Sequence, residues 1–242
     1  MSKGLITIDG KEVGKPALIK KENSITIDGK EMGSGGLVDL VFIIDTTISM
    51  SGKIHGLLKT CSEFVDDFAR LGLDQQIAVV SYGYLAVPGD RIDASLFTSK
   101  IEVVKRYLSD IHRNYGGGRF GESSPEAIEK AITLGFRPGS VQVFILITDE
   151  HARNDWSRIE ALGARLIRSE ILVFVISDPQ DCYKRMAKQS GGSWYQIAAD
   201  TNFSSILDLF RAVSKKVSQV VLDVHQLGHG SVSRYRQLSS GK

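Results

Sequence analysis

VDLVFIIDTTISM, residues 38–50, is the stretch that decides the fold. Its first part, Val38–Asp45, is a continuous apolar run that ends in an aspartate, which is typical of a strand buried on both faces of a sheet. After Met50 the apolar residues recur at the i, i+3, i+4, i+7 spacing of a helix. These residues are Ile54, Leu57, Leu58, Cys61, Phe64, Val65, Phe68 and Leu71. The stretch therefore predicts a buried strand followed by a helix that packs on the core.

The same alternation continues along the chain. Further apolar runs occur at 76–82, 141–148 and 171–176, with a weaker one at 194–198. Helical patterns intervene around 99–112, 122–135, 154–169 and 202–217. Strands that alternate with helices require crossover connections, and these give a parallel sheet covered on both faces. We therefore predict an α/β fold with a doubly wound, mainly parallel, Rossmann-like sheet flanked by helices.

An internal repeat occupies the N-terminus. The segment Ile6–Gly14, ITIDGKEVG, returns as Ile25–Gly33, ITIDGKEMG. Each copy alternates apolar and polar residues into Asp-Gly, the pair that best accepts the positive φ angles of a type I′ hairpin turn. Residues 1–33 are therefore predicted to form a small β-hairpin module, a meander of about 30 residues. Its alternative is a flexible tail with chance similarity.

The remaining boundaries follow from composition. Ser34-Gly-Gly36 is typical of a flexible linker, which leaves residues 37–224 for the main domain. Residues 225–242 contain basic residues, serine and glycine but no acidic residue, and this composition predicts a disordered basic tail.

Composition and charge exclude several classes of protein. Thirty Lys and Arg against 28 Asp and Glu give a formal charge of +2, too small for a long-range field, so no nucleic acid is expected as a partner.

Cys61 and Cys182 have no CxxC companion and are expected to be buried thiols. The N-terminus lacks a signal-peptide core, and no run approaches the roughly 20 apolar residues of a membrane span. A cytoplasmic protein is expected.

Oxygen-bearing side chains follow two of the predicted strands. Asp45 is followed by Thr47 and Ser49 at alternate positions. Asp149 comes directly after the apolar run at 141–148. An isolated aspartate at a strand end is usually a helix cap or a loop residue. Ligands of open parallel sheets bind at the carboxyl ends of the strands, however, and hard oxygen donors suit a hard cation. The pattern favours a site for Mg²⁺, or for Mn²⁺ or Ca²⁺.

These motifs resemble the von Willebrand factor A (vWA) domain. They are an apolar strand, Asp-x-Thr-x-Ser followed by Met and an amphipathic helix, a later Gly-rich loop, and a strand ending in Ile-Thr-Asp. The resemblance covers Leu37 to Val224 and is to an intracellular, bacterial-type variant. It implies a metal-ion-dependent adhesion site (MIDAS) in which the hydroxyls of Thr47 and Ser49 bind the metal. Asp45 and Asp149 would bind directly or through water.

A fifth ligand is implied in the loop after the glycine run. Many members of the family have a threonine there, whereas here Gly116–Gly118 leads to Glu122. The resemblance to a variant loop makes Glu122 the candidate, with Ser123 or Ser124 as the alternative. Glu126 is instead expected to lie in the first turn of a helix, where the helix dipole favours acidic side chains.

The chain departs from the family pattern in ways that affect the partner. Ile48 stands where this variant often has glycine, and Arg119 where related loops often have aspartate. With Glu122 the site would hold three carboxylates, one negative charge more than a dication balances. In the family a partner's Asp or Glu completes the metal shell, and a third carboxylate weakens that attraction. A backbone carbonyl, a hydroxyl or water is the alternative to an acidic partner residue.

The predicted function is metal-dependent binding of a protein partner, in a larger intracellular assembly that the resemblance suggests includes an AAA+ ATPase. The sequence shows no nucleophile paired with a base, so nothing in it indicates an enzyme. A metal-dependent phosphohydrolase is one alternative, but such enzymes usually need a second aspartate where Thr47 stands, or a basic phosphate clamp. A structural protein that oligomerises through the N-terminal strands is another. Glu150 and His151 are expected to be loop residues, and Gly116–Gly118 lacks the pattern of a nucleotide-binding loop.

Overall fold

The computed structural model describes residues 7–8, 11–12, 25–27, 30–32, 36–70, 73–116, 122–149, 156–197, 203–227 and 232–240. The chain divides into two compact units, Met1–Ser34 and Gly35–Lys242. The smaller unit holds the repeat, and the larger one holds the sheet with its helices.

Each copy of the repeat forms its own antiparallel hairpin. β1 (Thr7–Ile8) pairs with β2 (Lys11–Glu12), and β3 (Ile25–Ile27) pairs with β4 (Lys30–Met32). Each copy of the repeat thus has a ladder of its own, and no ladder joins the two hairpins among the residues described in this unit. Pairing across an adjacent turn closes a short loop, whereas pairing between the repeats would close a longer one at a larger entropic cost.

The larger unit is built on one six-stranded sheet with the order β10-β9-β8-β5-β6-β7. Its strands are β5 (Leu37–Asp45), β6 (Asp74–Tyr82), β7 (Ile92–Ala94), β8 (Val141–Ile147), β9 (Leu172–Ser177) and β10 (Trp194–Gln196). All neighbouring strands are parallel except β7, an antiparallel edge strand on β6. The predicted mainly parallel α/β sheet is confirmed.

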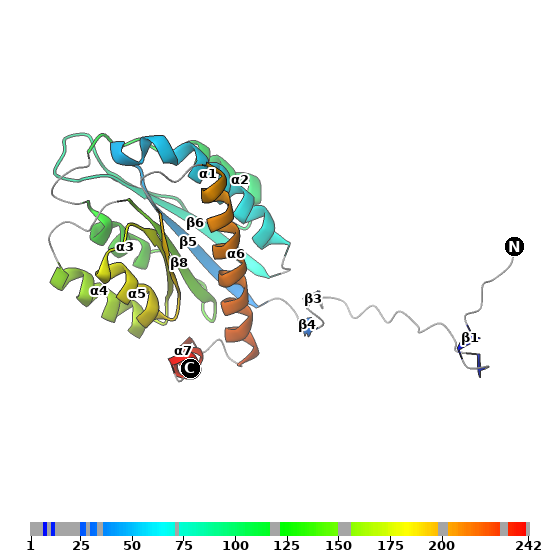
Figure 1. Cartoon of the computed structure of the whole chain (residues 1–242). Helices are drawn as coiled ribbons and strands as arrows, with labels where there is room; N and C mark the ends of the chain where they lie inside the picture. Colours follow the sequence, from blue (N-terminus) through cyan, green and yellow to red (C-terminus); the bar gives the residue numbers. More distant parts are fainter. Residues whose placement is uncertain are drawn as a thin grey trace, which may run out of the picture. The chain divides into compact units, whose positions relative to one another are not determined.

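Helices cover both faces of this sheet. They are α1 (Ser51–Ala69), α2 (Ile101–Ser109), α3 (Ser124–Ile132), α4 (Trp156–Arg168), α5 (Asp181–Ser190), α6 (Phe203–Gln226) and α7 (Val232–Ser240), with a short 3-10 helix η1 (Ile48–Met50) before α1. Figure 1 shows α1, α2 and α6 on one face and α3, α4 and α5 on the other. None of the described helices is both long and apolar enough to cross a membrane.

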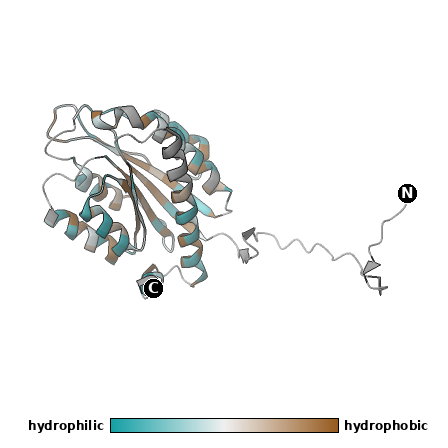
Figure 2. Ribbon diagram, in the orientation of Figure 1, coloured by the Kyte–Doolittle hydropathy of each residue, from teal (hydrophilic) through white to brown (hydrophobic). Residues whose placement is uncertain are grey.

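The core lies on both faces of the sheet, whose strands are the most apolar part of the fold (Figure 2). On the face covered by α1, the ring of Phe42 lies 5.4 Å from that of Phe64. On the other face, Ile128, Leu162 and Met186 from α3, α4 and α5 belong to one buried cluster with the strands. Cys61 and Cys182 are free and buried, as predicted.

Three elements were not predicted correctly by the apolar pattern. Helix α5 was missed because its sequence, DCYKRMAKQS, is mostly polar, although Cys182, Tyr183 and Met186 are buried. β7 was missed because its three residues lie at an edge and are not buried. The last long helix, α6, continues to Gln226, well past the pattern that ended at 217. Short or polar elements depend on tertiary contacts that periodicity does not record.

The C-terminal segment is a helix over Val232–Ser240, so the prediction of a disordered tail for 225–242 is wrong over these residues. Val232 is buried, and the Arg236 guanidinium donates to the carbonyls of Ile167, Ser190 and Ile171 at 2.8, 2.7 and 3.1 Å. Two of these carbonyls end α4 and α5, where unpaired backbone acceptors and the helix dipole favour a cation. Arg236 and the buried Val232 therefore help to dock a segment whose composition alone is typical of disorder.

His225, near the end of α6, lies against the start of β5. A Cβ atom built on Gly36 would lie 2.3 Å from the His225 ring. Nε2 is buried without a hydrogen-bond partner among the described residues. Burial lowers the pKa of His225 below its usual 6.5, against the opposing effect of a hydrogen bond to Leu37. The folded protein therefore favours the neutral ring.

A pH-dependent stability follows from this lowered pKa. Below pH 6.5 the unfolded chain takes up a proton that folded His225 resists, so the free energy of unfolding should fall as the pH decreases toward the folded pKa. Urea denaturation between about pH 5 and pH 8 measures the profile. We expect His225→Gln to flatten it, and His55→Gln, on the exposed face of α1, to leave it unchanged. Superimposable profiles of wild type and His225→Gln would contradict the prediction.

Candidate metal site

The candidate site lies at the carboxyl end of the sheet, where two central strands end side by side. Ile44 of β5 is in register with Ile147 of β8, so Asp45 and the Thr148–Asp149 pair emerge at the same edge. The Thr148 hydroxyl donates to Asp45 Oδ2 at 2.8 Å and joins the two strand ends directly. The parallel register thus brings together two aspartates that are far apart in sequence.

The loop after β5 folds back on Asp45. Asp45 Oδ1 accepts hydrogen bonds from the Thr47 backbone N–H at 2.9 Å and from the Thr47 hydroxyl at 2.7 Å. Thr47 Oγ1 also lies 3.0 Å from Ser49 Oγ, in the 3-10 helix η1 that precedes α1. This turn, in which an aspartate accepts from the backbone two residues later, arises from local sequence. It places the oxygens of Asp45, Thr47 and Ser49 close together.

Glu122 and Asp149 complete the group. Glu122 Oε1 lies 2.6 Å from Thr47 Oγ1, and the Ser49 hydroxyl donates to Asp149 Oδ1 at 2.9 Å. The structure therefore brings all five predicted residues, Asp45, Thr47, Ser49, Glu122 and Asp149, into one connected set.

The two serines that were the alternatives to Glu122 are engaged elsewhere. Ser123 Oγ accepts a hydrogen bond from the Leu85 backbone N–H at 3.0 Å, and Ser124 Oγ lies 2.7 Å from the Tyr183 hydroxyl. Glu126 lies in the first turn of α3, as expected, and accepts from Arg158 at 2.7 Å. Of this segment, Glu122 is the residue whose side chain lies beside Thr47.

Two carboxyl groups of the site are buried, and burial shifts the pKa of one of them. Asp45 is fully buried and Glu122 is 1% exposed. Burial raises the pKa of Asp45, against the opposing effect of hydrogen bonds to Glu122, Thr47 and Thr148. Burial also raises the pKa of Tyr82, and the neighbouring Asp45 charge adds to the shift. Two buried carboxyl groups side by side are stabilised either by a shared proton or by a cation.

The donor set fits a hard cation, and the Thr47 hydroxyl shows why. Its oxygen lies within 3.0 Å of Asp45 Oδ1, Glu122 Oε1 and Ser49 Oγ, yet a hydroxyl has one proton to donate. Oxygens gathered around one point in excess of their protons are the donors that Mg²⁺ prefers. No group of three or more His, Cys, Asp and Glu suited to a metal occurs among the described residues. A metal here would therefore depend on the hydroxyls as well as on the carboxylates.

Several supporting residues escaped the sequence analysis. The Asp90 carboxylate accepts from the backbone N–H groups of Tyr84, Tyr115 and Gly116, each at 2.8 Å. Asn114 donates through Nδ2 to the Thr46 hydroxyl at 2.7 Å. These contacts fix the loops around the site. Their only sequence signal is an aspartate that follows a Pro-Gly turn, a pattern too common to identify a site.

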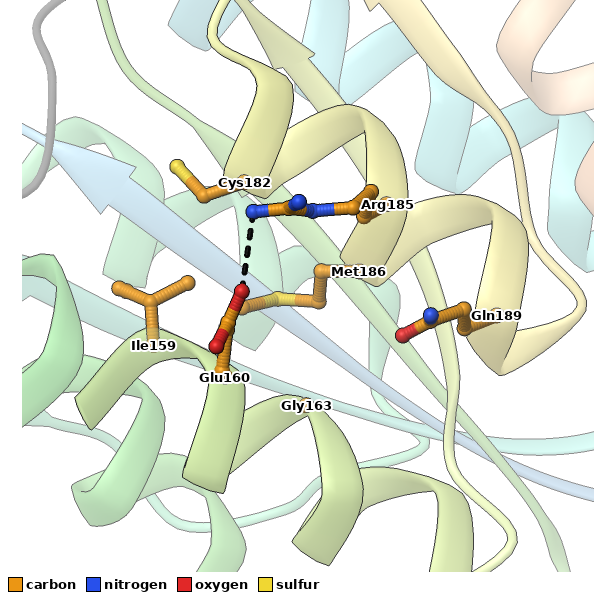
Figure 3. Close-up of a pocket in the computed structure, with 7 residues that line it drawn as sticks. All are labelled: Ile159, Glu160, Gly163, Cys182, Arg185, Met186 and Gln189. Carbon is orange, nitrogen blue, oxygen red and sulfur yellow. Dashed lines mark hydrogen bonds and ion pairs between the residues drawn. The ribbon is translucent and has the colours of Figure 1, made fainter. Parts of the chain in front are cut away.

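Four other segments discussed from the sequence lie outside the described residues: Gly117–Gly118, Arg119, Glu150 and His151. A pocket of about 250 Å³ lies elsewhere, between α4 and α5 (Figure 3). The Arg185 guanidinium reaches across it to Glu160 at 3.0 Å, beside Cys182 and Met186. None of the five candidate residues lines this pocket.

Solved structures with a similar fold come from different sources. The pilus adhesin SpaC of Lactobacillus rhamnosus GG matches with a TM-score of 0.60 and 12% identity, over 79% of this chain and 31% of the adhesin. Proximal thread matrix protein 1 of the mussel byssus matches with a TM-score of 0.56 and 18% identity, over 76% of this chain and 46% of that protein. This chain therefore spans less than half the length of either.

A third structure is matched over almost its whole length. An aerotolerance-related membrane protein from Bacteroides fragilis NCTC 9343 has a TM-score of 0.53 and 14% identity, over 75% of this chain and 99% of that one. At these identities the likeness establishes the fold alone. No curated protein matches the sequence. Residues 39–212 match the von Willebrand factor type A domain. The chain belongs to the von Willebrand factor type A domain family.

Proposed function

We propose that this chain is a metal-dependent protein-binding module. Asp45, Thr47, Ser49, Glu122 and Asp149 would hold one Mg²⁺, and a protein partner would bind to the same site through an oxygen ligand. Domains of this family are commonly interaction modules rather than enzymes.

The observation that carries the proposal is the crowding of oxygens around Thr47 Oγ1. Asp45 and Glu122 lie on either side of this hydroxyl at 2.7 and 2.6 Å, in a region that solvent does not reach. Two carboxylates placed so close repel each other unless a proton or a cation lies between them. A dication removes that repulsion and uses the hydroxyl oxygen as a further ligand, so this arrangement supports metal binding.

The charge of the site bears on the partner. A bound dication supplies Lewis acidity, which attracts an oxygen from a second protein. The carboxylates of Asp45, Glu122 and Asp149 exceed its charge by one if all are ionised. An aspartate or glutamate of the partner is the leading candidate for that oxygen, and a neutral carbonyl or hydroxyl is the alternative. Binding of metal and of partner would be linked, because each changes the affinity for the other.

A titration with Mg²⁺ tests the proposal. We expect isothermal titration of the full chain to show one bound ion and thermal unfolding to move to higher temperature with Mg²⁺. At a free concentration of 100 times the Kd, the stabilisation is about 2.7 kcal/mol. Glu122→Gln keeps an oxygen but removes a charge, and should weaken Mg²⁺ binding by about 10- to 100-fold.

The matched control is Glu126→Gln, the same chemical change four residues along, in a side chain that pairs with Arg158. It should bind Mg²⁺ like the wild type. Absence of both heat and thermal shift in the wild type would reject the proposed function. Equal affinities of wild type and Glu122→Gln would remove Glu122 from the ligand set and leave the other four residues as candidates.

A further inference from the structure

A second pocket lies where β6 pairs with β7, the antiparallel edge strand of the sheet. It has a volume of about 300 Å³, and Ser81 and Asp93, which are paired in this ladder, both line it. Val80 and Tyr82 belong to the buried cluster on the face of α3, α4 and α5, so the alternation of side chains places the pocket on the opposite face. None of the five candidate metal ligands lines it. We call it the edge pocket.

Backbone hydrogen bonds fix the walls of the edge pocket. The Ser95 N–H donates to the Val79 carbonyl at 2.9 Å. The Arg91 N–H donates to Asn114 Oδ1 at 2.9 Å. Val79, Arg91 and Ser95 all line the pocket. Pockets from about 300 Å³ upward are typical of small-molecule sites, and a preformed pocket loses little conformational entropy when a ligand binds.

Ser81 brings an unpartnered hydroxyl into the edge pocket. It is 3% exposed, and β6 holds it between Ile44 of β5 and Asp93 of β7. Its hydroxyl makes no hydrogen bond within the part of the chain that the structure describes. His112 also lines the pocket, and its Nε2 is buried without a hydrogen-bond partner among the described residues. Polar groups removed from water are costly unless they are hydrogen-bonded, so this lining favours a ligand that bonds to it.

The charges that line the edge pocket favour a cation. Arg91 Nε donates to Asp93 Oδ2 at 2.7 Å, so these two charges balance. Asp110 lines the pocket as well, and it makes no ion pair among the described residues. The arginines nearest to Asp110 in sequence, Arg106 and Arg113, do not line the pocket. With a neutral histidine, the lining therefore has one negative charge in excess.

The end of α2 adds to this negative potential. Asp110 is the C-cap residue of α2. The last carbonyls of a helix lack partners within the helix and form the negative end of its dipole, so an aspartate is unfavourable at this position. A cation beside Asp110 would remove that unfavourable interaction.

The rest of the lining separates an organic cation from a metal ion. No group of three or more His, Cys, Asp and Glu suited to a metal occurs among the described residues, although Asp93, Asp110 and His112 share this pocket. Tyr107 and Ile111 line it too. An aromatic ring attracts a cation, and an apolar side chain packs against an alkyl chain.

We propose that the edge pocket binds an organic cation, an ammonium or guanidinium group on a short alkyl chain. Its charged group would lie beside Asp110 and donate to the Ser81 hydroxyl, while the alkyl chain would pack against Ile111. The cation belongs either to a free amine or to a lysine or arginine side chain of a protein. This site goes beyond the proposed function and does not depend on a bound metal.

Titration of the ¹⁵N-labelled full chain with butylammonium, followed by NMR, tests the proposal. We expect saturable shifts at Ser81, Asp93 and Asp110, and none with butyrate, an anion of similar size. Asp110→Asn should weaken binding by about tenfold or more, and Ser81→Ala by about fivefold. The matched control is Glu102→Gln, which removes the same charge from the first turn of α2, where this side chain is 88% exposed. It should bind butylammonium like the wild type.

A capped Gly-Lys-Gly peptide distinguishes the two sources of the cation. Tighter binding of the peptide than of butylammonium supports the pocket with a protein side chain as its ligand, and weaker binding supports it with a free amine. Absence of saturable shifts with both probes overturns the proposal, and so does butyrate binding as tight as that of butylammonium. Wild-type affinity in a folded Asp110→Asn or Ser81→Ala also overturns it. Shifts centred on Asp45 and Thr47 would place the cation in the candidate metal site and reject the edge pocket.

Discussion

Replacement of Asp45 by alanine is expected to lower the affinity for Mg²⁺ by more than about 100-fold. Loss of an outer-shell partner in a metal site typically costs about 10- to 100-fold, and a carboxylate at the centre of the oxygen cluster should cost more. Asp45 is fully buried and accepts from Thr47 and Thr148, so it fixes both the charge and the arrangement of the site. Isothermal titration of the full chain measures the change.

Two further variants make this result interpretable. Asp93→Ala removes the same charge from β7, where Asp93 pairs with Arg91 in solvent, and it should bind Mg²⁺ like the wild type. Asp45→Asn keeps the shape and the acceptor oxygen but removes the charge, and should also lose most of the affinity. Circular dichroism shows whether each variant is folded. Wild-type affinity in a folded Asp45→Ala would rule out this aspartate as a ligand.

Replacement of Arg137 by methionine is expected to destabilise the fold by about 3–5 kcal/mol. Asp39 on β5 is fully buried, and Arg137 Nε donates to its Oδ1 at 2.8 Å. The same guanidinium donates to the carboxylate of Asp74 and to the carbonyl of Val38, on the neighbouring strands β6 and β5. Without the arginine a buried carboxylate loses its cation, and the two strand ends lose a bridge.

Urea denaturation measures this loss, and a double variant isolates its cause. Asp39→Asn with Arg137→Met removes both charges, so it should cost less than the sum of the two single changes. Arg91→Met breaks the exposed pair with Asp93, and should cost no more than about 1 kcal/mol. A loss below about 1 kcal/mol for Arg137→Met would contradict the prediction.

The strands and helices that carry strong periodicity could be predicted from the sequence. β5 and α1 follow from the apolar run Val38–Asp45 and the helical spacing after Met50, because burial on two faces or on one face leaves a distinct pattern. Helix α5 and helix α7 could not be predicted in this way. They are mostly polar, and their positions depend on contacts such as those of Arg236 with carbonyls distant in sequence.

The residues of the candidate site also differ in whether the sequence could predict them. Asp45, Thr47 and Ser49 are adjacent in sequence, and their motif was readable because a local turn brings them together. The proximity of Glu122 and Asp149 to that motif was inferred from a family resemblance, and the structure places both within hydrogen-bonding distance of Thr47 and Ser49. Asp90 and Asn114 carry no readable signal, because each acts on loops that only the folded chain brings near.

By itself the sequence determined the α/β alternation, the hairpin repeat, the buried cysteines and the strand that ends in Asp45. Only the tertiary structure decided that Thr47 Oγ1 lies within hydrogen-bonding distance of both Asp45 and Glu122, and that Asp90 joins two loops. Local sequence sets the conformation of neighbouring residues, whereas these contacts join residues from separate strands and loops. They exist because a parallel sheet gathers the carboxyl ends of its strands at one edge.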